Sequence, residues 1–198
     1  MRIEIRNDSV VVDGYVNAVE RESRLIQNVQ GAFKEKVKAG AFEKALKRAE
    51  NVRMLLNHDN SRELGSTRDG NLELHEDNIG LRAIATITDA DVIEKARKGE
   101  LRGWSFGFFA NSDEWEEREN APKLRTLIDI ELDEVSLIDN TGIPAYIGTS
   151  VETRNGKETL KELRELDGNK VFTEDFSVEP NLETNLNDYK KILDELRK

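Results

Sequence analysis

A serine flanked by glycines is the feature of this chain most able to do chemistry. The segment GWSFGF, residues 103–108, places Ser105 between bulky apolar residues, with a glycine two positions away on either side. Side chains alternate between the faces of a strand, so Ser105 would share its face with Gly103 and Gly107 while the aromatic residues pack on the core. Ser105 could then meet a substrate backbone as a nucleophile. The alternative is a core strand whose glycines allow close packing, and this segment alone favours that alternative.

A histidine that follows a short apolar run is the candidate base. His58 stands in LLNHD, residues 55–59, where an apolar segment ends, and such a position lies at a sheet edge near a cleft. An unperturbed imidazole titrates close to neutral pH, which suits general-base catalysis. The chain has one other histidine, His75, which falls on the polar side of its segment and is expected to be exposed and dispensable. A structural hydrogen bond is the competing role for His58.

The candidate acid lies in the long strand-like segment 124–138. Alternate residues of this segment form one face that is apolar except at Glu134 and Ser136, whereas the other face is acidic and solvated. A carboxylate on a buried face is costly unless it is paired. The partner of the Glu134 carboxylate could be an imidazolium that it orients, or an arginine such as Arg82 or Arg102 in an ion pair. Serine, histidine and carboxylate together are the groups used in acyl-transfer hydrolysis.

Length and composition limit the classes of protein to consider. A chain of 198 residues can bury a full core. Hydrophobic residues make up 37% and charged residues 35%, so part of the chain is expected to be extended or disordered. A net charge of -10 argues against a general nucleic-acid binder. The absence of cysteine excludes disulfides, thiolate metal sites and a cysteine nucleophile. No secretory leader or membrane-spanning run is recognisable, and no cofactor or metal is expected.

The elements that must position these residues are mostly strands. Helical spacing of apolar residues predicts two helices, over 41–49 and 89–98, the second capped by Asp89 and ended by Gly99. Asp69-Gly70 predicts a hairpin between strands at 64–67 and 71–75. Further strands are expected at 3–12, 14–19, 52–56, 80–86, 101–109 and 124–138, with a solvated polar hairpin or loop at 111–122. The fold class is therefore mainly β with flanking helices (α+β).

The composition changes after Val151, which predicts two parts. Residues 1–150 are expected to form the globular domain and residues 151–198 a charged, partly helical tail. Thin leucine stripes over 152–170 and 185–198 predict two short helices, which are marginal without a partner surface. The tail is expected to make few contacts with the domain and to be removable without unfolding it.

The order of several segments resembles the prohead (procapsid) maturation serine proteases of tailed phages, a family distantly related to the herpesvirus assembly protease, assemblin. The resemblance spans roughly residues 10–152. It rests on GYVNAV, GAFKEKVKAGAFEKAL, VRMLLNHD followed by LGST, NIGLRA, VIEKARKGELRGWSFGF and IELDEVSLIDNTGIPAY. In that family the histidine of NHD, the serine of SFGF and the acid before VSL form the catalytic triad. The resemblance thus assigns these roles to His58, Ser105 and Glu134.

The family further implies a fold, a substrate and a place of action. The fold would be a closed antiparallel β-barrel of the herpesvirus-protease type, flanked by helices. The substrates would be the scaffold (delta) domain of the major capsid protein and the protease's own tail, with a possible homo-oligomer and with no nucleic acid or membrane as partner. The protease would act inside the assembling prohead in the cytoplasm of the host bacterium. In this chain Asp139 to Ile143 intervenes before Pro144, and the loop 140–142 could supply oxyanion-hole amides.

Two other functions stay open on the sequence. A catalytically inactive capsid-assembly scaffold or binding module predicts that Ser105 is buried or out of reach of His58. An unrelated β-barrel binding domain predicts no hydrogen bond between them. The distance from Ser105 Oγ to the nearer His58 ring nitrogen separates both from a protease.

Overall fold

The described residues form two β-sheets and two short helices. The computed structural model describes residues 1–28, 31–141, 148–154, 157–165 and 170–177. In chain order the elements are β1 (Arg2–Ile5), β2 (Val10–Ala18), β3 (Ile26–Asn28), β4 (Gly31–Val37), α1 (Ala41–Arg48), β5 (Arg53–Leu56), β6 (Asp59–Ser66), β7 (Leu72–Glu76), β8 (Gly80–Ile87), α2 (Ala90–Arg97), β9 (Leu101–Glu116), β10 (Lys123–Asp139), β11 (Gly148–Arg154), β12 (Lys157–Glu165) and β13 (Phe172–Asp175). The mainly β class predicted from the sequence is confirmed.

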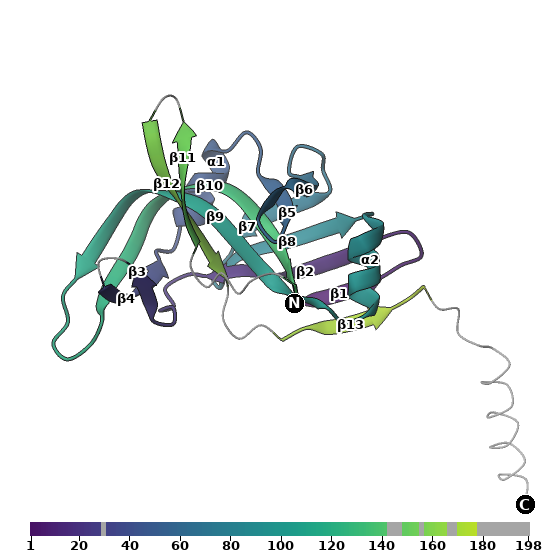
Figure 1. Ribbon diagram of the computed structural model, residues 1–198, viewed down its shortest axis with the longest axis horizontal. Helices are drawn as coiled ribbons and strands as arrows, with labels where there is room; N and C mark the ends of the chain where they lie inside the picture. The colour runs from purple at the N-terminus through teal and green to yellow at the C-terminus, as the bar shows by residue number, and fades with distance from the viewer. Residues whose placement is uncertain (29–30, 142–147, 155–156, 166–169, 178–198) are drawn as a thin grey trace, which may run out of the picture.

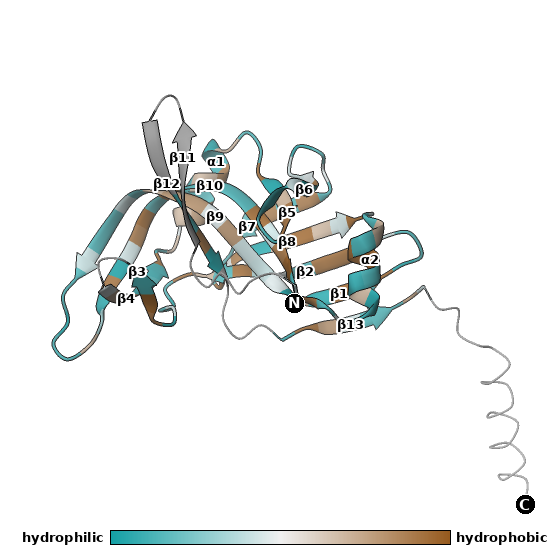
Figure 2. Cartoon of the chain, viewed as in Figure 1, coloured by the Kyte–Doolittle hydropathy of each residue, from teal (hydrophilic) through white to brown (hydrophobic). Residues whose placement is uncertain are grey.

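The first sheet has the strand order β13-β1-β2-β8-β7. Its central strands alternate apolar and polar residues, so that one face is buried: Val10, Val12 and Val16 of β2 are fully buried, as are Ala83 and Ile87 of β8. Figure 2 shows hydrophobic residues gathered in β1, β2 and β8. Helix α2 lies beside this sheet (Figure 1). As expected, Asp89 caps the helix by accepting a hydrogen bond from the Val92 amide at 3.0 Å.

The second sheet has the order β11-β12-β9-β10-β4-β3 and carries the candidate site. Its two longest strands, β9 and β10, form a long antiparallel hairpin, and β4 pairs with the beginning of β10 near the turn of that hairpin (Figure 1). Strand β5 pairs in parallel with the second half of β10, and β6 pairs with β5. The segment 111–122, expected to be a solvated hairpin or loop, forms the end of this hairpin, because β9 continues to Glu116 and β10 begins at Lys123.

The two sheets share one hydrophobic core. It joins Ile3, Val12 and Ala83 from the first sheet to Trp104 and Val135 from the second. A single parallel bridge between Val19 and Val37 links the sheets at one corner. The pairings of the described strands do not close a ring, so the closed barrel stays a prediction.

The hairpin predicted around Asp69-Gly70 is wrong. Strand β6 pairs with β5 in the second sheet, whereas β7 pairs with β8 in the first. The turn residues are present, but the chain crosses from one sheet to the other there. The Asp-Gly signal specifies a tight turn, and whether the flanking strands pair depends on which partner buries their apolar face.

The C-terminal segment contains strands where the leucine stripe predicted a helix. Within the described part of 152–170, β11 and β12 form an antiparallel pair, and β12 adds to the edge of β9. Strand β13 pairs in parallel with β1. The helical prediction for 152–170 and the expectation of few contacts are therefore wrong for these residues. The helix predicted over 185–198 lies outside the described residues, and the domain boundary after residue 150 stays a prediction.

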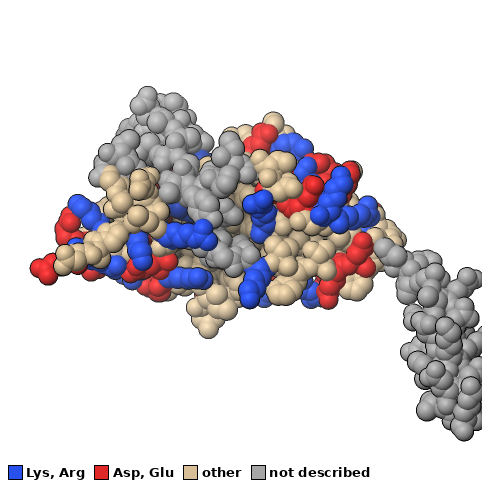
Figure 3. Space-filling view, turned by 60° about the horizontal axis from the view of Figure 1, so that its bottom comes forward, with Lys and Arg blue, Asp and Glu red and all other residues tan. Residues whose placement is uncertain are grey.

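Basic and acidic side chains are interspersed over the face shown in Figure 3. Surface ion pairs of the molecule include Arg2 with Glu174 and Lys47 with Glu43. Such exposed pairs each contribute little to stability.

Candidate active site

Three adjacent strands bring the candidate residues together. Ser105 lies on β9, Glu134 lies on β10, and His58 lies in the turn that joins β5 to β6. Strand β10 is the centre of this arrangement, because it pairs with β9 on one side and with β5 on the other. Ser136 of β10 lies opposite both Ser105 and Leu55 in these pairings.

A continuous hydrogen-bonded chain joins the three side chains. His58 Nε2 lies 2.7 Å from Ser105 Oγ, and His58 Nδ1 lies 2.6 Å from Glu134 Oε1. An ionised carboxylate only accepts hydrogen bonds, so with Glu134 ionised Nδ1 would donate to it, and Nε2 of a neutral ring could accept the serine proton. The contact between serine and histidine that the sequence predicted is present. The Glu134 side chain is fully buried and that of His58 is 11% exposed.

The turn that carries His58 has an unusual backbone. Asn57 and His58 have φ values of 54° and 61°, and together they form the tight connection from β5 to β6. Two consecutive residues with positive φ are the requirement of a type I′ hairpin turn, and asparagine tolerates that conformation better than most residues. The Asn57 side chain also fixes the turn to the end of β10. It donates to Asp139 Oδ1 at 2.9 Å and accepts from the Asp139 amide at 3.0 Å.

A β-bulge changes which face Glu134 occupies. Leu132 lies opposite Phe108, yet Glu134 lies opposite Gly107, so Asp133 is an extra residue on β10. Residues directly opposite each other share a face, and Glu134 therefore shares the face of Gly107 and not that of Leu132. The prediction that Glu134 continues the apolar face of β10 is wrong. Glu134 is nevertheless buried, because His58 and β12 cover its face.

Glycine at position 107 leaves room for the carboxylate. A Cβ atom built on Gly107 would lie 2.5 Å from Glu134 Oε1 and 2.5 Å from Lys161 Cε, far inside normal contact. The two glycines beside Ser105 were interpreted as clearing a path for substrate. In the structure, the missing side chain of Gly107 instead leaves space on β9 for the carboxylate of Glu134.

Ser136 supports both the acid and the histidine. Its hydroxyl donates to Glu134 Oε2 at 2.7 Å, and its oxygen accepts from the His58 amide at 3.1 Å. Both carboxylate oxygens of Glu134 are thereby occupied, one by the imidazole and one by Ser136. The sequence contained the signal, because Ser136 was the other polar residue of an otherwise apolar alternation, but no role was assigned to it.

The proposed sources of oxyanion-hole amides are only partly described. The Thr141 amide donates to Asp139 Oδ1 at 2.8 Å, so it does not point to an external anion. Gly142, the last residue of the loop suggested for this role, lies outside the described residues.

Strand β12 covers the nucleophile. It runs antiparallel to β9, with Arg164 opposite Phe106 and Glu165 opposite Ser105. Ser105 Oγ lies 2.7 Å from the Arg164 carbonyl oxygen, and Ser105 is only 1% exposed. In this conformation an external substrate has no access to the serine.

A buried ion cluster fastens β12 in place. Arg164 donates to both oxygens of Glu35 on β4, at 2.7 and 3.1 Å. Arg125 of β10 donates to Glu35 at 3.0 Å, to Glu162 at 2.7 Å and to Asp113 at 2.6 Å. Burial disfavours the charged form of Glu162, but the neighbouring Arg125 and Arg164 outweigh it and hold the pKa of that carboxyl below its ordinary value.

The alternative partners suggested for Glu134 are engaged elsewhere or distant. Arg82 forms a bidentate pair with Asp13 at 2.6 and 2.8 Å, and Arg102 is exposed. The cation closest to Glu134 among the described residues is Lys161, whose Nζ lies 3.9 Å from Oε1 and 2.6 Å from Asp133. His75 is exposed on β7, as predicted.

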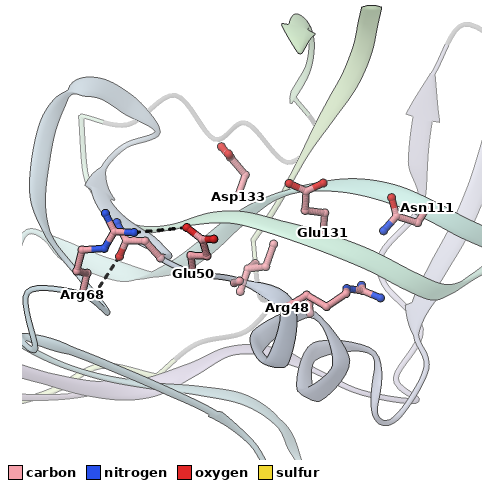
Figure 4. A pocket seen from close by; sticks show the side chains of 10 residues that line it. Arg48, Glu50, Arg68, Asn111, Glu131 and Asp133 are labelled. Carbon is pink, nitrogen blue, oxygen red and sulfur yellow. Dashed lines mark hydrogen bonds and ion pairs between the residues drawn. The ribbon is translucent and has the colours of Figure 1, made fainter. Parts of the chain in front are cut away.

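A pocket of about 520 Å³ lies between the end of α1 and residues 131–133 of β10 (Figure 4). Its floor includes Ala45, Ala49 and Leu132, and charged side chains such as Arg48, Glu50 and Glu131 surround it. None of the three candidate residues lines it. The pocket therefore does not belong to the serine site.

The described residues also bear on metal and membrane sites. Within the described ranges, no three histidine or acidic side chains converge in a way that could hold a metal ion. No helix in the same ranges is long and apolar enough to cross a bilayer.

Comparison with known proteins identifies a family. A family model described as caudovirus prohead serine protease matches residues 1–162. No curated protein and no solved structure matches the chain.

Proposed function

The chain belongs to the caudovirus prohead serine protease family, and we propose that Ser105, His58 and Glu134 are its catalytic triad. Members of this family are serine peptidases that act within the assembling capsid, on capsid proteins. We further propose that this enzyme removes the scaffold domain of the major capsid protein and cuts its own C-terminal segment.

Ser105 supplies the nucleophile. In the proposed reaction its Oγ attacks the scissile carbonyl carbon while its proton passes to His58 Nε2. The histidine then returns this proton to the leaving amine. An acyl-enzyme ester remains on Ser105, and water hydrolyses it by the same route in reverse. The 2.7 Å contact between Oγ and Nε2 supports the first of these proton transfers.

Glu134 orients the imidazole. A carboxylate 2.6 Å from Nδ1 keeps the proton on that nitrogen and stabilises the imidazolium that forms during attack. Ser136 holds the second oxygen of the carboxylate, so the acid cannot rotate away from the ring. Glu134 therefore acts by orientation and charge, and a neutral isostere should keep some activity.

The observation that carries the proposal is the unbroken chain Glu134–His58–Ser105, with contacts of 2.6 and 2.7 Å. An inactive assembly module would not need a buried carboxylate and a positive-φ histidine aligned on one serine. Burial of Ser105 is the one feature that such a module shares with the structure. It results from β12, which pairs with β9 on one side and with β11 on the other, so that β11 and β12 can leave together without breaking the β9–β10 pairing.

The test is co-expression of the chain with its cognate major capsid protein. Wild type should shorten the capsid protein, whereas Ser105→Ala and His58→Ala should leave it at full length. Two matched controls come from the same chain. Ser112→Ala changes an exposed serine of β9, and His75→Ala changes the other histidine.

Both controls should cleave as wild type does. Loss of cleavage in His75→Ala but not in His58→Ala would show that the wrong histidine has been chosen. A full-length capsid protein with the wild-type chain, together with stable binding, would favour the inactive assembly module. Equal trimming by wild type and Ser105→Ala would indicate a contaminating protease.

A further inference from the structure

Strand β12 lies where a peptide substrate would lie. It is extended and antiparallel to β9, and it occupies the edge of the strand that carries the nucleophile. Adding a strand to a sheet edge is a common mode of peptide recognition, with main-chain pairing for affinity and side-chain pockets for specificity. The carbonyl that Ser105 contacts belongs to the bond between Arg164 and Glu165.

The contact is a resting one and not yet an attack. Ser105 has a single hydroxyl proton, and two acceptors lie 2.7 Å from Oγ: the Arg164 carbonyl oxygen and His58 Nε2. When the proton points to the carbonyl oxygen, it is not shared with the imidazole. Reaction requires the hydroxyl to turn to Nε2 and Oγ to approach the carbonyl carbon.

The side chain of Arg164 fills a site built for a guanidinium. It is 5% exposed, donates to both oxygens of Glu35, and lies over the Phe108 ring at 5.4 Å from its centroid. Glu35 itself is 4% exposed. A buried carboxylate beside an aromatic face binds a basic side chain, and its two oxygens fit a guanidinium best while still offering an ion pair to an ammonium group.

The charges of the site call for a basic partner. Three acidic groups, on Glu35, Asp113 and Glu162, surround the two guanidinium groups of Arg125 and Arg164. If β12 leaves, Glu162 and Arg164 go with it, and Arg125 alone remains for two carboxylates. A buried carboxylate without a full partner is costly, so a strand that brings a new cation to Glu35 is favoured over one that does not.

We propose that Glu35 makes the protease specific for arginine or lysine at the residue before the cleaved bond, and that β12 is a resident substrate strand with Arg164 at that position. This inference rests on the proposed function, in which Ser105 is the nucleophile. Ser105 Oγ forms a bond to the Arg164 carbonyl carbon, and the bond to the Glu165 nitrogen breaks. The serine proton passes through His58 to that nitrogen, and water then hydrolyses the ester to leave a carboxylate on Arg164.

The experiment analyses the full chain by intact mass after co-expression with the capsid protein. In wild type, self-cleavage should give fragments that end at Arg164 and begin at Glu165, and each capsid cut should follow arginine or lysine. Arg164→Lys should retain the cut at 164, whereas Arg164→Gln should lose it by at least about 30-fold. Ser105→Ala should show neither cut.

Glu35→Gln tests the selecting carboxylate itself. It should slow cleavage after basic residues by at least about 30-fold, and thermal melting shows whether the variant is folded. Should it fail to fold, the pair Arg164→Lys and Arg164→Gln still decides the question, because both leave Glu35 intact.

The failures are distinguishable. If wild type and Ser105→Ala behave alike, the proposed function is wrong. If wild type cleaves the capsid protein but after residues that are not basic, or if folded Glu35→Gln cleaves unchanged, only the specificity assignment is overturned. If capsid cuts follow basic residues while the 164–165 bond stays intact, β12 is not a substrate strand.

Discussion

Substituting Gly107 by alanine should impair the site although none of Ser105, His58 and Glu134 is replaced. The new Cβ would lie 2.5 Å from Glu134 Oε1, whereas ordinary contacts begin at 3.4 Å. The carboxylate must therefore retreat by about 0.9 Å, a distance obtained by subtracting the first value from the second. Lys161 Cε, the other near atom, belongs to a flexible side chain and can move at little cost.

The retreat of Glu134 breaks its contact with the histidine. The carboxylate is fully buried and held by His58 and Ser136, so it has no free space to enter. A move of about 0.9 Å directly away from the ring would lengthen the 2.6 Å contact with Nδ1 to about 3.5 Å, outside the usual hydrogen-bond range. A misplacement of about 1 Å in a catalytic group can reduce the rate about 10²-fold, and overpacking costs about 1–3 kcal/mol of stability.

The assay measures the initial rate of capsid-protein cleavage and the free energy of unfolding in urea. Gly107→Ala should remain folded, with a rate about 10²-fold below wild type. The matched control is Gly14→Ala in β2, where the three atoms nearest to the new Cβ all belong to Met1, at 3.1 to 3.3 Å. That variant should cleave at the wild-type rate. A Gly107→Ala protein with wild-type rate and stability would refute the view that position 107 sets the place of Glu134.

Three further changes test the supports of the site. Ser136→Ala should lower the cleavage rate and also the free energy of unfolding by about 1–3 kcal/mol, because it leaves one Glu134 oxygen buried without its donor, as urea denaturation would measure. Asn57→Ala should cost about 1 kcal/mol more than Asn57→Gly in the same measurement, because both lose the bonds to Asp139 but only glycine adopts φ 54° without strain. The pKa of Glu162 is lower in the folded protein than in the unfolded chain. Its ionised carboxylate therefore contributes fully to the free energy of unfolding above the ordinary carboxyl pKa of about 4.3, and this contribution is lost as the pH falls through the folded pKa. The stability difference between wild type and Glu162→Gln should thus be constant near neutral pH and shrink below about pH 4, and a difference that grows on acidification would contradict the assigned sign.

Local sequence patterns predicted the three residues of the site, but they did not predict the strands and contacts that surround those residues. Ser105 between glycines, His58 at the end of an apolar run and Glu134 within a strand are all signals carried by a few neighbouring residues. The structure brings these three side chains together. Their catalytic roles stay predictions until cleavage by the variants is measured.

The bulge at Asp133 could not be predicted from alternation. A strand with one extra residue looks continuous in sequence, because the interruption lies in the pairing with β9 and not in the residue types. The alternation assigned Glu134 to the face of Leu132, and only the register shows that these residues face opposite sides. The burial of Glu134 was inferred correctly for a reason that does not hold.

The strand β12 was missed because its partners are distant in sequence. The leucines of 157–165 are three residues apart, a spacing that suits a helix, and the helix propensity of the neighbouring residues also favours a helix. The edge of β9 instead offers backbone groups with which β12 pairs. Glu162 and Arg164 lie two residues apart and so share one face of β12, from which both contact the ion cluster of Arg125 and Glu35. Those partners lie 37 and 129 residues away along the chain, so a pattern of neighbouring residues cannot predict the contacts.

The arrangement of Glu134 and His58 costs stability, which favours a catalytic role for these residues over a purely structural one. A fully buried carboxylate requires desolvation, and apolar residues of similar size often stabilise a protein at least as well. His58 holds a positive φ of 61°, which adds about 1–2 kcal/mol of strain for a residue with a side chain. Both costs fall on the same hydrogen-bonded chain that ends at Ser105. Selection for stability alone would remove them, whereas selection for an oriented imidazole next to a hydroxyl would keep them.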